Sequence, residues 1–161
     1  TNETIQRLPL DLHEIIHDAI HHTHLIFKNK SGKLQTQFKA PNSVVYGNKS
    51  HMTNVVVNLL DNAIKYCEIV PSVKIETLNE DNNFILKVID NGIGMTPSVQ
   101  KKIFDKFYRA TSGNIHTTKG HGLGLAYVKR IVDLHKGQIN LESKEKVGTK
   151  FILTLPIYKL I

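Results

Sequence analysis

The stretch Ser50-His-Met-Thr-Asn-Val-Val-Val-Asn-Leu-Leu-Asp-Asn-Ala-Ile-Lys-Tyr66 decides the fold, because it reads as one amphipathic helix with an unusual polar face. Its apolar residues recur at helical spacing, at Met52, Val56, Leu59, Leu60 and Ala63. The opposite face carries Asn54, Asn58, Asp61, Asn62 and Lys65. Asparagine is a poor helix former, and an ordinary solvated face would favour Glu, Lys and Gln. A row of amide oxygens ending in a lysine suits a hydrated Mg²⁺ and the phosphates that accompany it.

Hydrophobic periodicity predicts the remaining elements. Helices are expected over residues 11–28, 98–107 and 123–136, with Asp11 capping the first and Gly137 ending the last. The apolar face of the first is expected to consist of Leu12, Ile15, Ile16, Ala19, Ile20, Ile26 and Phe27. Strands are expected over residues 34–39, 44–46, 73–78, 84–89, 138–143 and 149–155, the last four as two hairpins. Residues 109–121 have no period and predict a mobile loop. The expected fold class is α/β, a two-layer sandwich in which a mixed β-sheet is covered on one face by about three helices.

Two glycine-containing stretches are candidates for binding. In Val88-Ile-Asp90-Asn-Gly92-Ile-Gly94-Met95 an apolar strand delivers a carboxylate into a loop with two glycines. This pattern fits an ordinary turn and equally a carboxylate that accepts hydrogen bonds from a ligand. In Lys119-Gly-His-Gly-Leu-Gly-Leu-Ala126 a glycine-rich turn opens into a helix, where backbone N–H groups can hold phosphate. Neither the dinucleotide-binding nor the P-loop pattern occurs, so those two classes of nucleotide site are excluded.

Composition and charge limit the number of domains and the kinds of partner that the chain can have. The chain has 161 residues, 40% of them hydrophobic, which fits one domain. Its net charge is +7, but the basic residues are dispersed and not interleaved with aromatic ones, so nucleic acid is not expected as a partner. The single cysteine, Cys67, excludes an intrachain disulfide and fits a reducing compartment. No run approaches the roughly 18 apolar residues of a membrane span, so this domain is expected to make no direct membrane contact.

Four motifs taken in order resemble the catalytic domain of sensor histidine kinases. Asn58-Leu-Leu-Asp-Asn-Ala-Ile-Lys-Tyr66 is similar to the N box and Asp90-Asn-Gly-Ile-Gly94 to the G1 box. Ile103-Phe-Asp-Lys-Phe-Tyr-Arg109 is similar to the F box and Gly120-His-Gly-Leu-Gly-Leu125 to the G2 box. The resemblance implies the Bergerat fold of the GHKL superfamily, with ATP and Mg²⁺ as cofactors and residues 109–121 as the ATP lid. It also implies that residues 9–161 form the catalytic domain and residues 1–8 the remnant of a connector.

The resemblance also implies roles for individual residues. Asp90 would accept a hydrogen bond from the exocyclic amine of adenine, Tyr66 would pack on the ring, and Asn62 would be the Mg²⁺ ligand. Asn58, Lys65 and Arg109 would be the catalytic residues, with Lys65 and Arg109 meeting the phosphates. The remaining residues expected to contact the nucleotide are Gly92, Ile93, Gly94, Phe107, Lys119, Gly120, His121, Gly122, Leu123, Gly124 and Leu125.

The phosphoacceptor histidine is not expected in this chain. His13-Glu14 has the dipeptide of an acceptor site, but the sequence that follows it does not match. The resemblance therefore implies that the acceptor lies on dimerisation helices of the same parent protein. It further implies a response regulator receiver domain as partner and a cytoplasmic domain of a parent protein in the bacterial inner membrane.

His13, His17, His21 and His24 lie on one side of the first helix and could hold a transition metal, although a solvated polar face is the preferred interpretation.

Three other functions compete with the histidine kinase. A GHKL ATPase would carry a water-activating Glu where this chain has Asn58. A serine-directed GHKL kinase shares the same boxes, although the full F box favours the histidine kinase. A basic binding module without catalysis predicts no affinity for ATP.

Overall fold

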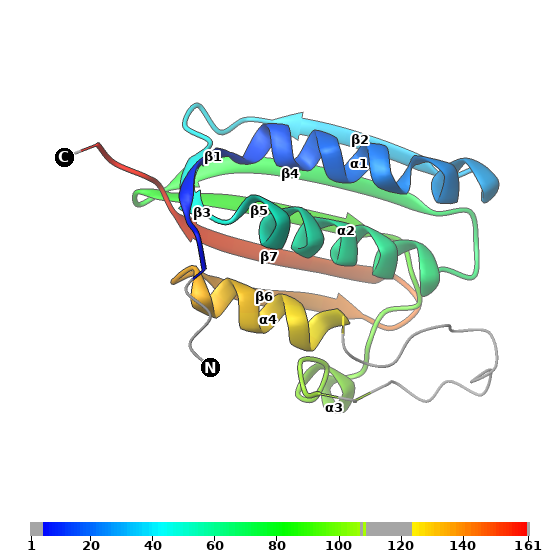
Figure 1. Cartoon of the computed structure of the whole chain (residues 1–161). Coiled ribbons are helices and arrows are strands. Elements are labelled where there is room, and N and C mark those ends of the chain that lie inside the picture. The colour runs from blue at the N-terminus through cyan, green and yellow to red at the C-terminus, as the bar shows by residue number, and fades with distance from the viewer. Residues whose placement is uncertain (1–4, 107, 109–123, 161) are drawn as a thin grey trace.

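The computed structural model describes residues 5–106, 108 and 124–160 of the chain, and Figure 1 shows the arrangement of its elements. The helices are α1 (Leu12–Asn29), α2 (Lys49–Lys65), α3 (Pro97–Gln100) and α4 (Gly124–Leu134). The strands are β1 (Leu8–Asp11), β2 (Lys33–Phe38), β3 (Val44–Gly47), β4 (Ser72–Glu80), β5 (Asn83–Asp90), β6 (Gln138–Lys144) and β7 (Gly148–Pro156).

One five-stranded sheet, in the order β2-β4-β5-β7-β6, forms the first layer. The pair β2–β4 is parallel and the other pairs are antiparallel, so the sheet is mixed. Helices α1, α2 and α4 lie side by side on one face of this sheet (Figure 1). This confirms the predicted two-layer α/β sandwich, in which the apolar core lies between the helices and the sheet.

Helix α2 forms as its sequence predicts. The Asn48 side chain accepts a hydrogen bond from the backbone N–H of His51 at 3.0 Å and caps the N-terminus of the helix. All of the residues predicted for its apolar face are buried: Met52, Val56, Leu59, Leu60 and Ala63. Helix α2 is the central one of the three helices (Figure 1), and the polar residues of its C-terminal half line a pocket: Asn58, Asp61, Asn62 and Lys65.

Strand β1 was not predicted. It pairs with β3 in a separate two-stranded antiparallel sheet, with Leu8 opposite Gly47 and Asp11 opposite Val44. The predicted strands 34–39 and 44–46 therefore belong to different sheets. The Arg7 guanidinium, just before β1, donates to the backbone carbonyl of Leu134 at the end of α4. Whether residues 1–8 are the remnant of a connector stays a prediction.

The helix predicted over residues 98–107 is wrong in length, because regular helix ends at Gln100. The hydrogen bonds that follow tighten to three-residue spacing, from Lys102 N to Val99 O at 3.0 Å and from Asp105 N to Lys102 O at 2.9 Å. Residues 101–106 are therefore a series of turns. These turns bring Phe104 against Phe151 of β7, with ring centroids 6.4 Å apart.

The predicted end of α4 needs a correction as well. The helix ends at Leu134, and Lys136, not Gly137, adopts the left-handed conformation, with φ of 59°. Gly137 serves close packing instead, since a Cβ atom there would lie 2.5 Å from the carbonyl oxygen of Thr154.

Helix α1 departs from prediction on both of its faces. Ile26 is 41% exposed, and Thr23 is buried in its place, its hydroxyl bonded to the Ala19 carbonyl at 3.1 Å. His13 does not lie on a solvated face: its ring stacks on Phe38 with centroids 4.4 Å apart. The His13 Nε2 atom is also 2.8 Å from the Thr77 hydroxyl, because the first turn of α1 lies over the sheet. Within the described part of the chain, no group of three or more His, Cys, Asp or Glu is placed to hold a metal ion.

Candidate functional site

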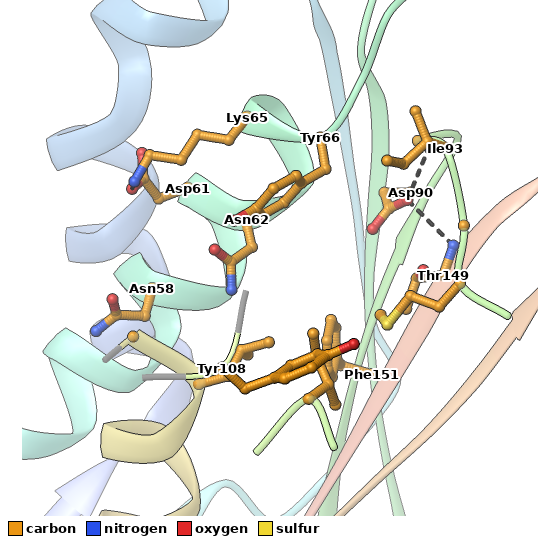
Figure 2. Close-up of a pocket in the computed structure, with 16 residues that line it drawn as sticks. Asn58, Asp61, Asn62, Lys65, Tyr66, Asp90, Ile93, Tyr108, Thr149 and Phe151 are labelled. Carbon is orange, nitrogen blue, oxygen red and sulfur yellow. Dashed lines mark hydrogen bonds and ion pairs between the residues drawn. The ribbon is translucent and has the colours of Figure 1, made fainter. Parts of the chain in front are cut away.

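A pocket of about 190 Å³ opens between α2, the segment after β5, strand β7 and the start of α4. Figure 2 shows that Asp90 lies on one side of this pocket, and Asn58, Asn62 and Lys65 of α2 lie on the other. The sheet therefore contributes a wall with the Asp90 carboxylate, and α2 contributes the opposite wall, with two amide side chains and a lysine.

Asp90, the last residue of β5, is partly buried and anchored through one oxygen. Its Oδ1 atom accepts hydrogen bonds from the backbone N–H groups of Gly92 at 2.8 Å and Thr149 at 3.1 Å. No described residue donates a hydrogen bond to the Oδ2 atom of Asp90, so that oxygen is left for a ligand in the pocket. Burial raises the pKa of the Asp90 carboxyl, and the two backbone donors oppose this shift.

The loop after Asp90 depends on glycine. Gly94 has φ of 70°, and a Cβ atom on it would lie 2.0 Å from the carbonyl oxygen of Lys144. The Ser143 hydroxyl of the β6–β7 hairpin accepts from the N–H of Met95 at 2.9 Å and also lies 2.8 Å from the Thr149 hydroxyl. The loop is thus fixed against the same hairpin that supplies Thr149 to Asp90.

The polar face of α2 forms the opposite wall. The Asn58 side chain donates through Nδ2 to the Asn54 carbonyl at 2.8 Å, which directs its Oδ1 atom toward Gly124 at the start of α4. A Cβ atom on Gly124 would lie only 3.1 Å from that oxygen. The Lys65 ammonium forms an ion pair with Asp61 one turn earlier at 2.9 Å, so the cation lies at the rim of the pocket and is partly exposed.

Comparisons with known proteins agree with this geometry. Residues 47–159 match the family described as Histidine kinase-, DNA gyrase B-, and HSP90-like ATPase. The chain belongs to this family. The match covers α2, the Asp90 loop, α4 and β7, which are the elements that form the walls of the pocket.

Within this family, the chain is similar to sensor kinases. Sensor protein RprX of Bacteroides fragilis is 43% identical over 158 residues, covering 97% of this chain and 30% of RprX. Sensor-like histidine kinase SenX3 of Mycobacterium tuberculosis is 33% identical over 156 residues, covering 94% of this chain and 38% of SenX3. This chain therefore spans about a third of the length of these relatives.

The fold agrees with solved structures. The catalytic domain of histidine kinase ThkA has a TM-score of 0.80 at 24% identity, covering 95% of this chain and 99% of that domain. ThkA has also been solved in complex with response regulator protein TrrA. The family and its relatives show that this chain corresponds to the ATP-binding catalytic domain found in sensor histidine kinases.

The pocket brings together the predicted residues that the structure describes: Asn58, Asn62, Lys65, Tyr66, Asp90, Gly92, Ile93, Gly94, Gly124 and Leu125. Their roles toward a nucleotide stay predictions. The other predicted residues lie outside the described part of the chain: Phe107, Arg109, Lys119, Gly120, His121, Gly122 and Leu123. The predicted ATP lid, residues 109–121, lies outside it as well.

Asp61, predicted on the polar face of α2 without a role of its own, also lines the pocket. Sequence reasoning missed several further residues that line it: Met95, Ile103, Tyr108, Thr149 and Phe151. Thr149 could have been found, because it occupies the first inward position of β7 and is followed in alternation by Phe151, Leu153 and Leu155. A polar residue at an otherwise apolar inward position is a signal for a site.

The donor set of the pocket fits Mg²⁺. Mg²⁺ prefers oxygen ligands, keeps several waters and takes phosphate oxygens, so it needs few ligands from the protein. The Asn62 side chain reaches into the pocket, and Asn58 has its Oδ1 atom nearby (Figure 2). These residues suit a metal ion that arrives together with a nucleotide.

No described helix is long and apolar enough to cross a membrane.

Proposed function

We propose that this domain binds Mg-ATP and transfers the γ-phosphate to a histidine on dimerisation helices of the same parent protein. The observation that carries the proposal is the anchored Asp90 carboxylate, with Oδ1 satisfied by two backbone donors and Oδ2 facing the pocket. In the transfer, a bond forms between an imidazole nitrogen and the γ-phosphorus, and the bond from that phosphorus to the bridging oxygen breaks. ADP is the leaving group.

Adenine recognition follows from the chemistry of Asp90. The exocyclic amine of adenine donates hydrogen bonds, whereas guanine presents a carbonyl at the same position. An acceptor facing another acceptor leaves both groups unpaired, which disfavours guanine strongly. Tyr66 and Ile93 lie beside Asp90 in the pocket and are proposed to contact the base (Figure 2).

The polar face of α2 is proposed to serve the phosphates. Asn62, with Asn58 beside it, would hold Mg²⁺, which when bound neutralises charge on the phosphate oxygens. Lys65 would exchange its ion pair with Asp61 for a phosphate, and Arg109 would add a second cation. Phosphoryl transfer needs mainly such positioning and charge neutralisation.

Asn58 favours a kinase over a GHKL ATPase. An amide cannot remove a proton from water, so the general base of an ATPase is missing at this position. His13 is not a suitable acceptor, because its ring is held between Phe38 and Phe84 in the packing of α1 on the sheet.

The proposal extends to the parent protein. A response regulator receiver domain would take the phosphate from the acceptor histidine. The parent would lie in the bacterial inner membrane, with this domain in the cytoplasm.

The test uses this chain and the parent's helical hairpin as two separate proteins. The chain alone should bind Mg-ATP, label no residue of its own and release phosphate only slowly. Adding the hairpin should produce labelled hairpin, measured by gel autoradiography. Asn58→Glu should give at most slight hydrolysis, since a base also needs an aligned water. Rapid phosphate release or stable self-labelling of the parental chain would favour the ATPase or the serine-directed kinase instead.

A further inference from the structure

Asn91, the residue after Asp90, ties two segments together with its side chain. Its Oδ1 atom accepts hydrogen bonds from the Ser72 N–H at 2.8 Å and from the Cys67 thiol at 3.3 Å. Its Nδ2 atom donates to the Val70 carbonyl at 3.0 Å. Cys67 and Val70 lie in the connection between α2 and β4, and Ser72 is the first residue of β4, so one side chain holds the connection at two points and the start of β4 at a third.

The middle of the connection between α2 and β4, residues 67–70, has few other contacts to hold it, whereas the carbonyls of Tyr66 and Pro71 at its two ends accept hydrogen bonds from Ile93 and Lys33. Ile69 is 65% exposed and Val70 is 55% exposed, so the connection buries little apolar surface there. Within the described residues, every hydrogen bond that links residues 67–70 to another segment goes to Asn91. The Asn91 side chain is therefore the principal attachment of residues 67–70.

The same connection begins at the pocket. The Tyr66 carbonyl accepts a hydrogen bond from the Ile93 N–H at 2.8 Å, and a Cβ atom on Gly92 would lie 2.7 Å from that carbonyl oxygen. Tyr66 and Ile93 both line the pocket beside Asp90 (Figure 2). The Asp90 loop and the C-terminal end of α2 are thus in direct contact, and Asn91, which does not line the pocket, bonds to the segment that follows this contact.

We propose that Asn91 is a positioning residue for nucleotide binding, which locks the α2–β4 connection against the Asp90 loop so that Tyr66, Asp90 and Ile93 form the base pocket before ATP arrives. The inference rests on the proposed adenine role of Asp90. The side chain itself touches no substrate. Without it the pocket samples other arrangements, and the apparent affinity falls by the fraction of molecules that retain the competent one.

The test compares Asn91→Ala with a matched control, Asn79→Ala. The Asn79 side chain also makes three hydrogen bonds between segments, with the N–H and carbonyl of Asn42 and the carbonyl of Asn83. It lies toward the other end of β4, away from the pocket. Both variants should lower the melting temperature, because each loses the same kind of side-chain bridge.

Only Asn91→Ala should change nucleotide binding. Measured by calorimetry well below the melting temperature, its Kd for ATP should rise about tenfold, as expected if about a tenth of the molecules keep the competent pocket. The Kd of Asn79→Ala should equal the parental value. In the transfer assay with the parent's hairpin, Asn91→Ala should raise KM for ATP and leave kcat unchanged, because saturating ATP restores the pocket.

A conservative variant separates positioning from general destabilisation. Asn91→Asp keeps the acceptor for Ser72 and Cys67 but loses the donor to Val70, so its Kd should fall between those of the parent and Asn91→Ala. Tripolyphosphate, which has no base, should bind Asn91→Ala and the parent equally.

Two results would overturn the inference. One is a parental Kd for ATP in Asn91→Ala, and the other is an equal loss in Asn79→Ala. Asp90→Asn measured in parallel distinguishes this failure from that of the proposed adenine site, because parental binding by Asp90→Asn contradicts the site itself.

Discussion

Replacing Asp90 with asparagine should weaken ATP binding without weakening the fold. Asparagine can still accept from the N–H groups of Gly92 and Thr149 through its own Oδ1 atom, so the loop keeps both anchors. Its amide nitrogen then occupies the place of Oδ2 and presents a donor to the donor amine of adenine. Losing a charged hydrogen bond and leaving donors unpaired costs about 2–4 kcal/mol, which is roughly a 30- to 1000-fold rise in Kd.

The same substitution makes a prediction about stability and pH. Burial raises the pKa of the Asp90 carboxyl above its ordinary value, so protonation of this carboxyl favours the folded state. The ionised carboxylate therefore destabilises the fold progressively as pH rises through the folded-state pKa. Asp90→Asn cannot ionise, so its melting temperature should exceed the parental value near pH 7, and this difference should shrink toward pH 4.

The assay is calorimetric titration of ATP together with melting curves at several pH values. Asp18→Asn is the control, because Asp18 is an exposed carboxylate on α1, away from the pocket. Asp18→Asn should leave the Kd for ATP at the parental value. Near-parental binding of ATP by folded Asp90→Asn would refute the adenine assignment, and an unfolded Asp90→Asn would refute the claim that an asparagine keeps both backbone anchors of Oδ1.

Three further predictions follow from the geometry. Asn62→Ala should abolish transfer to the added hairpin by removing a Mg²⁺ ligand, a loss of several kcal/mol of transition-state stabilisation, and parental transfer in an autoradiographic assay would contradict the metal role. Burial lowers the pKa of His135 below 6.5, so the protein should lose stability as pH falls from 7 to 5, and His135→Gln should melt with a shallower pH dependence than the parent. Gly94→Ala forces a Cβ onto a backbone with φ of 70° and onto the Lys144 carbonyl, and denaturant melts should show a loss of more than about 2 kcal/mol of unfolding free energy.

Much of the fold was predictable because the decisive signals are local. The faces of α2 follow from periodicity within one helix, and its cap, Asn48, lies one residue before it. Strand β1 was not predictable in this way, since β3, the strand with which it pairs, lies more than thirty residues away. Pro9, which cannot donate to a strand ladder, weakens the local strand signal further.

The site was predictable only where its residues share a motif. Asn62, Tyr66 and Asp90 stand in the two stretches that resemble the N box and the G1 box. Thr149 comes from a strand 59 positions after Asp90, and only the sheet register brings its N–H to the carboxylate. His13 was assigned to a solvated face for a related reason, because helical spacing gives the direction of a side chain but not the position of Phe38 beneath it.

The Asp90 carboxylate affects both the stability of the fold and the specificity of the pocket. A carboxylate with one oxygen left for a ligand is destabilising when it is partly buried, and the N–H groups of Gly92 and Thr149 offset only part of that effect, since the pKa remains raised. A ligand that donates a hydrogen bond to Oδ2 removes the remaining free-energy cost of the partly buried carboxylate. A ligand that presents an acceptor to Oδ2 increases that cost. Because this contrast requires the carboxylate to stay in place, the residues that hold its loop, Asn91 among them, should affect discrimination between ATP and GTP as well as affinity. If Asn91→Ala weakens ATP binding, it should therefore leave the already weak binding of GTP nearly unchanged. The Kd for GTP divided by the Kd for ATP should then be smaller in the variant than in the parent.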